Sequence, residues 1–213
     1  MKTDDLVLML ATGAGAVAAK APLRRCLVAV GCATLVATLV MAIWLGVRPT
    51  LTGDMNQPML WIKEIFCIAL VAVGLFMVAR LARPGAGLAW APAVLAAPLL
   101  AMWGLAVFDL LAASPEDRTR LLLGISWTEC PYNIVVLSVP IFVAIVWAMK
   151  GLAPTRLRLA GAAAGFASGA IGALVYSLHC PELAAPFVGV WYVIGMLIPT
   201  AAGALLGPRL LRW

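Results

Sequence analysis

Long apolar runs separated by short polar segments make up most of the chain. Six of these runs are long enough, or nearly so, for a membrane-spanning helix, which needs about 20 predominantly apolar residues. We place the six spans at about residues 25–47, 62–81, 90–112, 132–149, 158–178 and 187–207. The pattern therefore predicts an all-α fold, a polytopic membrane protein built as a bundle of six transmembrane helices.

Composition supports a membrane protein and argues against direct nucleic-acid binding. Of the 213 residues, 64% are hydrophobic and only 11% are charged, which leaves too little polar surface for a soluble domain of this size. The net charge of +6 comes from Lys and Arg residues scattered singly or in pairs, without the basic stripe typical of nucleic-acid-binding proteins. The lipid bilayer is the expected surrounding.

The distribution of basic residues predicts the orientation, because cytoplasmic loops carry an excess of Lys and Arg. With the N-terminus in the cytoplasm, the cytoplasmic segments hold eleven: Lys2, Lys20, Arg24, Arg25, Arg80, Arg83, Lys150, Arg156, Arg158, Arg209 and Arg212. The other side holds four: Arg48, Lys63, Arg118 and Arg120. Both termini are therefore expected in the cytoplasm, and residues 48–61, 113–131 and 179–186 outside.

The first 24 residues form a separate N-terminal segment, and residues 25–213 form the transmembrane domain. Thr3 or Asp4 can cap a helix, and acidic side chains in a first turn favour helix formation. The spacing i, i+3, i+4 then gives this helix an apolar edge made of Leu6, Met9 and Leu10. So short a helix is marginal in water, and a frayed tail is the alternative. A small-residue linker, Gly13 to Ala21, is expected after it.

Two cysteine–proline pairs stand out among the five cysteines. Cys130-Pro131 and Cys180-Pro181 each lie where an apolar run begins or ends, in polar surroundings, and the predicted topology places both outside. In a bacterium that compartment is oxidising. The other three cysteines fall in or at the edge of apolar runs, where Cys usually behaves as a small buried hydrophobe: Cys26, Cys32 and Cys67.

Polar residues near these two cysteines widen the chemistry that the pair can support. Glu129 precedes Cys130, while His179 and Glu182 flank Cys180. Two thiols with these neighbours could close a structural disulfide, act as a sensing or redox-active pair, bind a soft metal transiently, or stay unpaired. No metal site is certain from sequence, no resident cofactor is expected, and no spacing matches the C-x-x-C pattern of thioredoxin-like centres.

Small residues in the fifth predicted span point to close helix packing. Gly161, Gly165 and Gly169 recur every four residues, and a sixth span with Gly195, Gly203 and Gly207 is the expected partner. Ionisable residues are few within the spans. Those present are expected to reach the membrane interface or to be paired, and this scarcity argues against a transporter: Lys63, Glu64 and Asp109.

Several stretches together resemble one known family. They are the start Met1 to Val7, the pair Cys130-Pro131, the glycine-rich run Gly161 to Tyr176 leading into Leu178-His179-Cys180-Pro181-Glu182, the pair Trp191-Tyr192 and the ending Gly207 to Trp213. In these residues the chain resembles the NrsF-like family of six-span anti-sigma factors of the bacterial inner membrane, which are negative regulators of extracytoplasmic-function sigma factors.

The resemblance implies a regulator without catalytic activity. Its cytoplasmic N-terminal segment would hold the sigma factor, with Asp4, Asp5, Leu6, Met9 and Leu10 as the expected contacts. The outer Cys130 and Cys180 would sense oxidative or heavy-metal stress and release it. A membrane thiol-disulfide oxidoreductase is the main alternative, although one cysteine per loop argues against it; a small transporter or metal exporter is the other.

Overall fold

The computed structural model describes residues 3–13, 21–83 and 91–212, and these contain helices and no strand. In chain order the helices are α1 Thr3–Gly13, α2 Ala21–Trp44, α3 Leu51–Asp54, α4 Pro58–Leu81, α5 Ala91–Ala112, α6 Pro115–Leu123, α7 Glu129–Lys150, α8 Leu157–Ser177 and α9 Ala185–Phe187. A π-helical turn, Val188–Tyr192, then leads directly into α10, Val193–Leu210.

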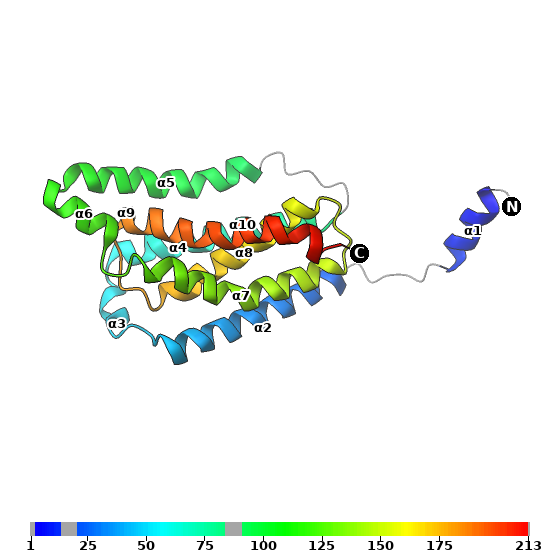
Figure 1. Cartoon of the computed structure of the whole chain (residues 1–213), viewed down its shortest axis with the longest axis horizontal. Coiled ribbons are helices and arrows are strands. Elements are labelled where there is room, and N and C mark those ends of the chain that lie inside the picture. The colour runs from blue at the N-terminus through cyan, green and yellow to red at the C-terminus, as the bar shows by residue number, and fades with distance from the viewer. Residues whose placement is uncertain (1–2, 14–20, 84–90, 213) are drawn as a thin grey trace.

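Six of the helices are long and apolar enough to cross a membrane, which confirms the predicted fold class. They run along a common direction and form an elongated bundle (Figure 1). Many large apolar side chains on the outside of the bundle are exposed, for example Ile43 at 85% and Leu205 at 77%. A protein in water rarely exposes so much apolar surface, whereas lipid tails solvate it well.

Helix α8 forms the centre of the bundle and is almost entirely buried, with α4, α7 and α10 packed around it. Its closest partner is α10, as predicted, and glycines make this approach possible. A Cβ on Gly161 would lie 2.7 Å from the Cα of Gly207, and one on Gly169 would lie 2.9 Å from the Cα of Met196. Any side chain at these positions would therefore push the two backbones apart.

One member of the predicted glycine pairing lies elsewhere. A Cβ on Gly195 would lie 2.8 Å from the Cδ1 of Ile134, so Gly195 faces α7 and not α8. Position 195 is on a different side of α10 from Gly203, because a helix turns by about 100° per residue. The glycines of α10 thus allow two different helices to approach it closely.

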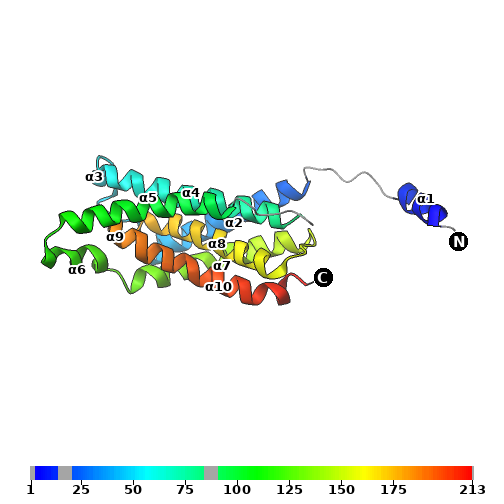
Figure 2. The same cartoon turned by 90° about the horizontal axis from the view of Figure 1, so that it is seen from above.

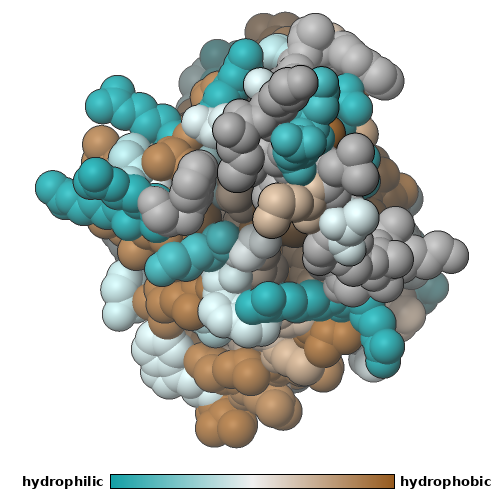
Figure 3. Space-filling model, turned by 90° about the vertical axis from the view of Figure 1, so that its right-hand side faces the viewer, coloured by the Kyte–Doolittle hydropathy of each residue, from teal (hydrophilic) through white to brown (hydrophobic). Residues whose placement is uncertain are grey.

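Charged residues divide sharply between the two ends of the bundle. The end where α2 begins and α10 ends carries nine Arg and Lys residues in the described part of the bundle and no acidic residue there. The opposite end carries four basic and seven acidic residues. Figure 3 views the first end, where hydrophilic side chains gather beside the apolar flanks.

Helix α1 is present as predicted and lies apart from the six long helices in both views (Figures 1 and 2). Asp4 and Asp5 occupy its first turn and are exposed. The side chains of Val7 and Met9 are also exposed, at 59% and 68%. The side chains of Leu6 and Leu10 lie outside the described residues. Of the predicted linker, Gly13 ends α1 and Ala21 begins α2, and residues 14–20 lie outside the described residues.

Candidate thiol site

Cys130 and Cys180 come together at the end of the bundle opposite to the chain termini. Cys130 is in the first turn of α7, and Cys180 lies in residues 178–184, the segment between α8 and α9 that we call the thiol loop. Both are free thiols, and the side chain of Cys130 interacts with that of Cys180 and influences its ionisation. The structure thus joins the two cysteines that the sequence singled out.

The prediction that the two cysteines lie in polar surroundings is wrong. Both residues have no exposed surface, and they belong to an apolar cluster that includes Ile134, Tyr176 and Tyr192. Helix α7 begins at Glu129, so Cys130 is already inside a packed helix. The thiol loop folds inward over the end of α8, which buries Cys180 as well. A reagent can reach either sulfur only when the segments that cover this end of the bundle move apart.

Lys63 of α4 is the main cationic element of the site. Of the two expectations for this residue, that it reaches the membrane interface or that it is paired, the first is wrong, because its side chain is completely buried. The Nζ atom donates hydrogen bonds to the carbonyl oxygens of Cys180 at 3.1 Å and Glu182 at 3.0 Å. It also lies 5.1 Å from the ring centre of Tyr192. Lys63 therefore holds the thiol loop against α4.

Arg48, in the segment after α2, provides a second cationic contact. Its Nη1 donates a 2.8 Å hydrogen bond to the carbonyl oxygen of Cys180, the same oxygen that Lys63 contacts. The same Nη1 lies 3.6 Å from a carboxylate oxygen of Asp54. The backbone N–H of Arg48 donates to the carbonyl of Leu178. Two buried cations thus converge on the backbone of one cysteine.

The three accessory residues lie near the thiols without joining them. The Nδ1 of His179 contacts the carbonyl oxygen of Gly46 at 2.8 Å, so this nitrogen carries a proton and donates it. Glu129 is exposed. The carboxylate of Glu182 accepts a 2.7 Å hydrogen bond from the backbone N–H of Ile125. In the described residues, no group of three or more His, Cys, Asp or Glu side chains is placed to hold a metal ion.

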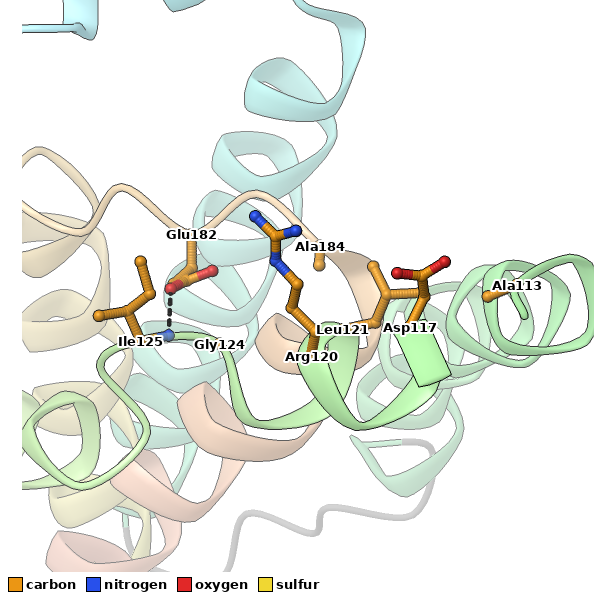
Figure 4. A pocket seen from close by; sticks show the side chains of 8 residues that line it. All are labelled: Ala113, Asp117, Arg120, Leu121, Gly124, Ile125, Glu182 and Ala184. Atoms are coloured by element: carbon orange, nitrogen blue, oxygen red, sulfur yellow. Dashed lines mark hydrogen bonds between the residues drawn. The ribbon is translucent and has the colours of Figure 1, made fainter. Parts of the chain in front are cut away.

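Gly124 and Glu182 form a contact that closes the end of the bundle where the two thiols lie. Gly124 has a φ of +53°, and a Cβ there would lie 2.6 Å from the carboxyl carbon of Glu182. A cavity of about 410 Å³ opens beside this contact, lined also by Asp117 and Arg120 of α6 (Figure 4). Because Glu182 is two residues from Cys180, this contact ties the segment before α7 to the thiol loop.

The electrostatic surroundings of Cys180 favour its thiolate form. The hydrogen bond from the Cys130 thiol lowers the pKa of Cys180 most, and burial opposes this effect. The positive charge of Lys63 and the backbone N–H of Glu182 lower the pKa further. The net result is a pKa of Cys180 below the usual range of a cysteine thiol, which favours the thiolate form of this residue.

The described structure is that of a six-span helical membrane protein with a buried, asymmetric thiol pair at one end and a separate acidic helix at the N-terminus. The sequence matches the family model described as "Negative regulator of sigma F" over residues 10–213. The chain belongs to this family of negative regulators of a sigma factor, which confirms the resemblance found in the sequence.

Two relatives match along their entire lengths. One is the "Probable anti-sigma-F factor NrsF" of Azospira oryzae, 52% identical over 213 residues, and the other is the "Anti-sigma-F factor NrsF" of Caulobacter vibrioides, 38% identical over 217 residues. In both cases the alignment covers 100% of this chain and 100% of the relative. No solved structure matches the chain.

Lys63, Arg48 and Tyr192 are the site residues that sequence reasoning did not select. A signal was present for Lys63, since an ionisable residue within a spanning helix usually marks a functional site. Its position near the end of an apolar run made an interfacial location equally consistent with the sequence. Nothing in the sequence indicates that Arg48 and Lys63 contact the same carbonyl oxygen. Arg48 lies 132 positions before Cys180 in the chain, and Lys63 lies 117 positions before it.

We expect Gly124→Ala to open the end of the bundle where the two thiols lie. The φ of +53° disfavours alanine, and the added Cβ would displace the Glu182 carboxyl group. The free energy of unfolding should fall by about 1–3 kcal/mol, and a membrane-impermeant maleimide should label Cys180 several-fold faster in the folded protein. Peptide mass spectrometry of the purified full-length protein measures this labelling.

Gly53→Ala is the matched control for this substitution. Gly53 lies at the same end of the bundle, its φ is not positive, and a Cβ there would meet nothing within 4 Å. Labelling and stability of this variant should equal those of the wild type. Unchanged labelling of Cys180 in a destabilised Gly124→Ala protein would show that this contact does not cover the thiols.

Proposed function

We propose that the chain is a membrane-bound anti-sigma factor that sequesters an extracytoplasmic-function sigma factor through its N-terminal segment. Oxidative or heavy-metal stress acts on Cys130 and Cys180 outside the cytoplasmic membrane and releases the sigma factor. The observation that carries this proposal is the pairing of the two cysteines in one buried site, in a chain whose family is defined by negative regulation of a sigma factor.

The charge distribution supports a cytoplasmic location for α1. Nine basic residues gather at the bundle end where α2 begins, and such an excess of Lys and Arg is typical of the cytoplasmic side. A sigma factor in the cytoplasm can therefore reach α1. Asp4 and Asp5 are exposed in the first turn, where they suit a basic surface on the partner. The apolar edge of the helix suits a groove.

The thiol site supports the sensing part of the proposal. A disulfide that only ties two loops together would need no buried cation beside it, whereas Lys63 and the Cys130 thiol both favour a thiolate on Cys180. A thiolate is the form that reacts with oxidants and binds soft metals. With no third ligand group assembled in the described residues, a heavy metal would be held by the two sulfur atoms.

The double substitution Leu6→Asp with Leu10→Asp tests the sigma-binding segment. Two carboxylates on the predicted apolar edge should abolish docking into a groove, because burying an unpaired charge is costly. We expect the sigma factor that co-purifies with the full-length chain to be lost, and target-gene repression with it. Affinity purification followed by mass spectrometry, together with transcript measurement, provides the readout.

Leu8→Asp is the matched control, since position 8 falls on the opposite side of an α-helix from positions 6 and 10. This variant should retain the sigma factor. If the double variant still retains the sigma factor and represses its target genes, the anti-sigma role of this segment is refuted. A thiol oxidoreductase, the alternative function, would show no sigma factor bound to the wild type.

Single substitutions Cys130→Ser and Cys180→Ser test the sensing role. Each variant should repress target genes without stress, because the sigma-binding segment is intact, and should lose induction by peroxide or cadmium. Transcript levels of the target genes before and after stress provide the measurement. Cys32→Ser, which changes an exposed cysteine of α2, should respond as the wild type does. Normal induction in both single variants would remove the two thiols from the sensing mechanism.

A further inference from the structure

We propose that Lys63 is a positioning residue that makes Cys180, and not Cys130, the first of the two thiols to react with an oxidant. The ammonium group does so by fixing the backbone of the thiol loop and by placing a positive charge beside the Cys180 sulfur. The inference rests on the proposed sensing function, because it names the residue that regulates the reactivity of that same site.

Lys63 is buried, and groups of the thiol site surround its ammonium group. The side chain has no exposed surface, although it lies in a helix long and apolar enough to span a membrane. Burying an ammonium group is costly unless nearby groups compensate for its lost hydration. Two carbonyl oxygens of the thiol loop and the face of Tyr192 provide this compensation. The partners of Lys63 are therefore parts of the thiol site itself.

The two hydrogen bonds of Lys63 fix the backbone of the thiol loop on both sides of Pro181. They end on the carbonyl oxygens of Cys180 and Glu182, and these two residues surround Pro181, whose ring fixes its own φ. The backbone N–H of Glu182 is in turn directed at the Cys180 sulfur. Lys63 thus fixes both the cysteine and the amide that stabilises its thiolate.

Other ionisable groups face Cys180 from every neighbouring element. They are Cys67 from α4, Cys130 from α7, Tyr176 from α8, Tyr192 from the π-helical turn, and Arg48 from the segment after α2. Cysteine and tyrosine become negative when they ionise, so they oppose a thiolate on Cys180 once charged. Arg48 is bound to the Cys180 carbonyl and to Asp54, which offsets its charge. In the described residues Lys63 forms no ion pair with a carboxylate, and its electrostatic interaction with Cys180 is larger than those with Cys67, Arg48 and Glu64.

In the proposed reaction, a hydroperoxide oxidises the two thiols in two steps. The Cys180 thiolate attacks the terminal oxygen, so that an S–O bond forms and the O–O bond breaks, and the leaving alkoxide takes a proton from water. The Cys130 sulfur then attacks the Cys180 sulfenic acid. The S–S bond forms, the S–O bond breaks, and hydroxide leaves with the Cys130 proton as water. Two electrons pass from the two thiols to the hydroperoxide.

The pH dependence of Cys180 alkylation tests the role of Lys63 directly. Purified full-length protein is treated with iodoacetamide between pH 5 and 10, values spanning the ordinary range of thiol titration, and labelling is resolved at each cysteine by peptide mass spectrometry. In Lys63→Met, we expect the midpoint for Cys180 to rise, so that labelling at pH 6 slows by about tenfold for each unit of rise. Lys63→Gln keeps N–H donors without the charge and should show the same rise.

Arg120→Met is the matched control, because it removes one positive charge from the exposed α6 at the same end of the bundle and should leave the midpoint unchanged. An unchanged midpoint in the Lys63 variants would overturn the proposal. The wild type supplies a readout that needs no Lys63 variant: Cys180 should react before Cys130, and the reverse order would also overturn it.

The alkylation experiments on Lys63 variants can be interpreted independently of the experiments that test sigma-factor binding and release. Reactivity is measured on the purified protein, so a shifted Cys180 midpoint supports the role of Lys63 even where stress induction proves independent of the cysteines. Conversely, loss of induction in Cys180→Ser with no effect of Lys63 substitution would support the sensing function and reject this inference.

Discussion

The hydrogen bonding of the buried Lys63 ammonium group is the interaction on which the thiol-bearing end of the molecule depends. Its hydrogen bonds to the Cys180 and Glu182 carbonyls join α4 to the loop between α8 and α9. Hydrogen bonds to charged groups contribute about 1.5–3 kcal/mol each, so these two contacts can offset part of the cost of burial. Arg48 adds the segment after α2 to the same carbonyl oxygen. The Glu182 carboxylate adds the segment before α7.

The thiol site and the N-terminal helix α1 lie at opposite ends of the bundle. The thiols are buried at one end of the bundle, while α1 lies apart at the other end (Figure 1). Under the proposed function, a change at Cys180 must cross the bundle to affect α1. The contact of α8 with α10 is made by glycines and leaves no space for a side chain between the two backbones, so these helices are closely packed along the bundle. A tenfold change in sigma affinity requires only about 1.4 kcal/mol of coupling.

The sequence allowed the fold to be predicted well because membranes impose a simple rule. Only helices or closed barrels satisfy all backbone hydrogen bonds in lipid, and six apolar runs of helical length leave few choices. The α8–α10 contact followed from Gly161, Gly165 and Gly169, whose spacing places them on one helix face. The prediction paired Gly195 with the wrong helix. A glycine indicates that some neighbouring helix approaches closely, but it does not indicate which one.

The candidate site was predictable only in part. The chain pattern identified Cys130 and Cys180, since each stands beside a proline at the end of an apolar run. Their burial was not predictable, because it depends on how the thiol loop folds over α8. The role of Lys63 depends on contacts across 117 and 119 positions of sequence, which local pattern does not reveal. Its occurrence in an apolar run was the one available signal.

The most direct test of the account follows thiol state and sigma binding in the same sample. A variant with Cys26, Cys32 and Cys67 changed to Ala retains only the two site cysteines and is reconstituted in lipid nanodiscs with the sigma factor that co-purifies with the wild type. Stepwise oxidation should form the Cys130–Cys180 disulfide and release the sigma factor in equal proportion, and reduction should restore binding. A fully formed disulfide with the sigma factor still bound would contradict the account.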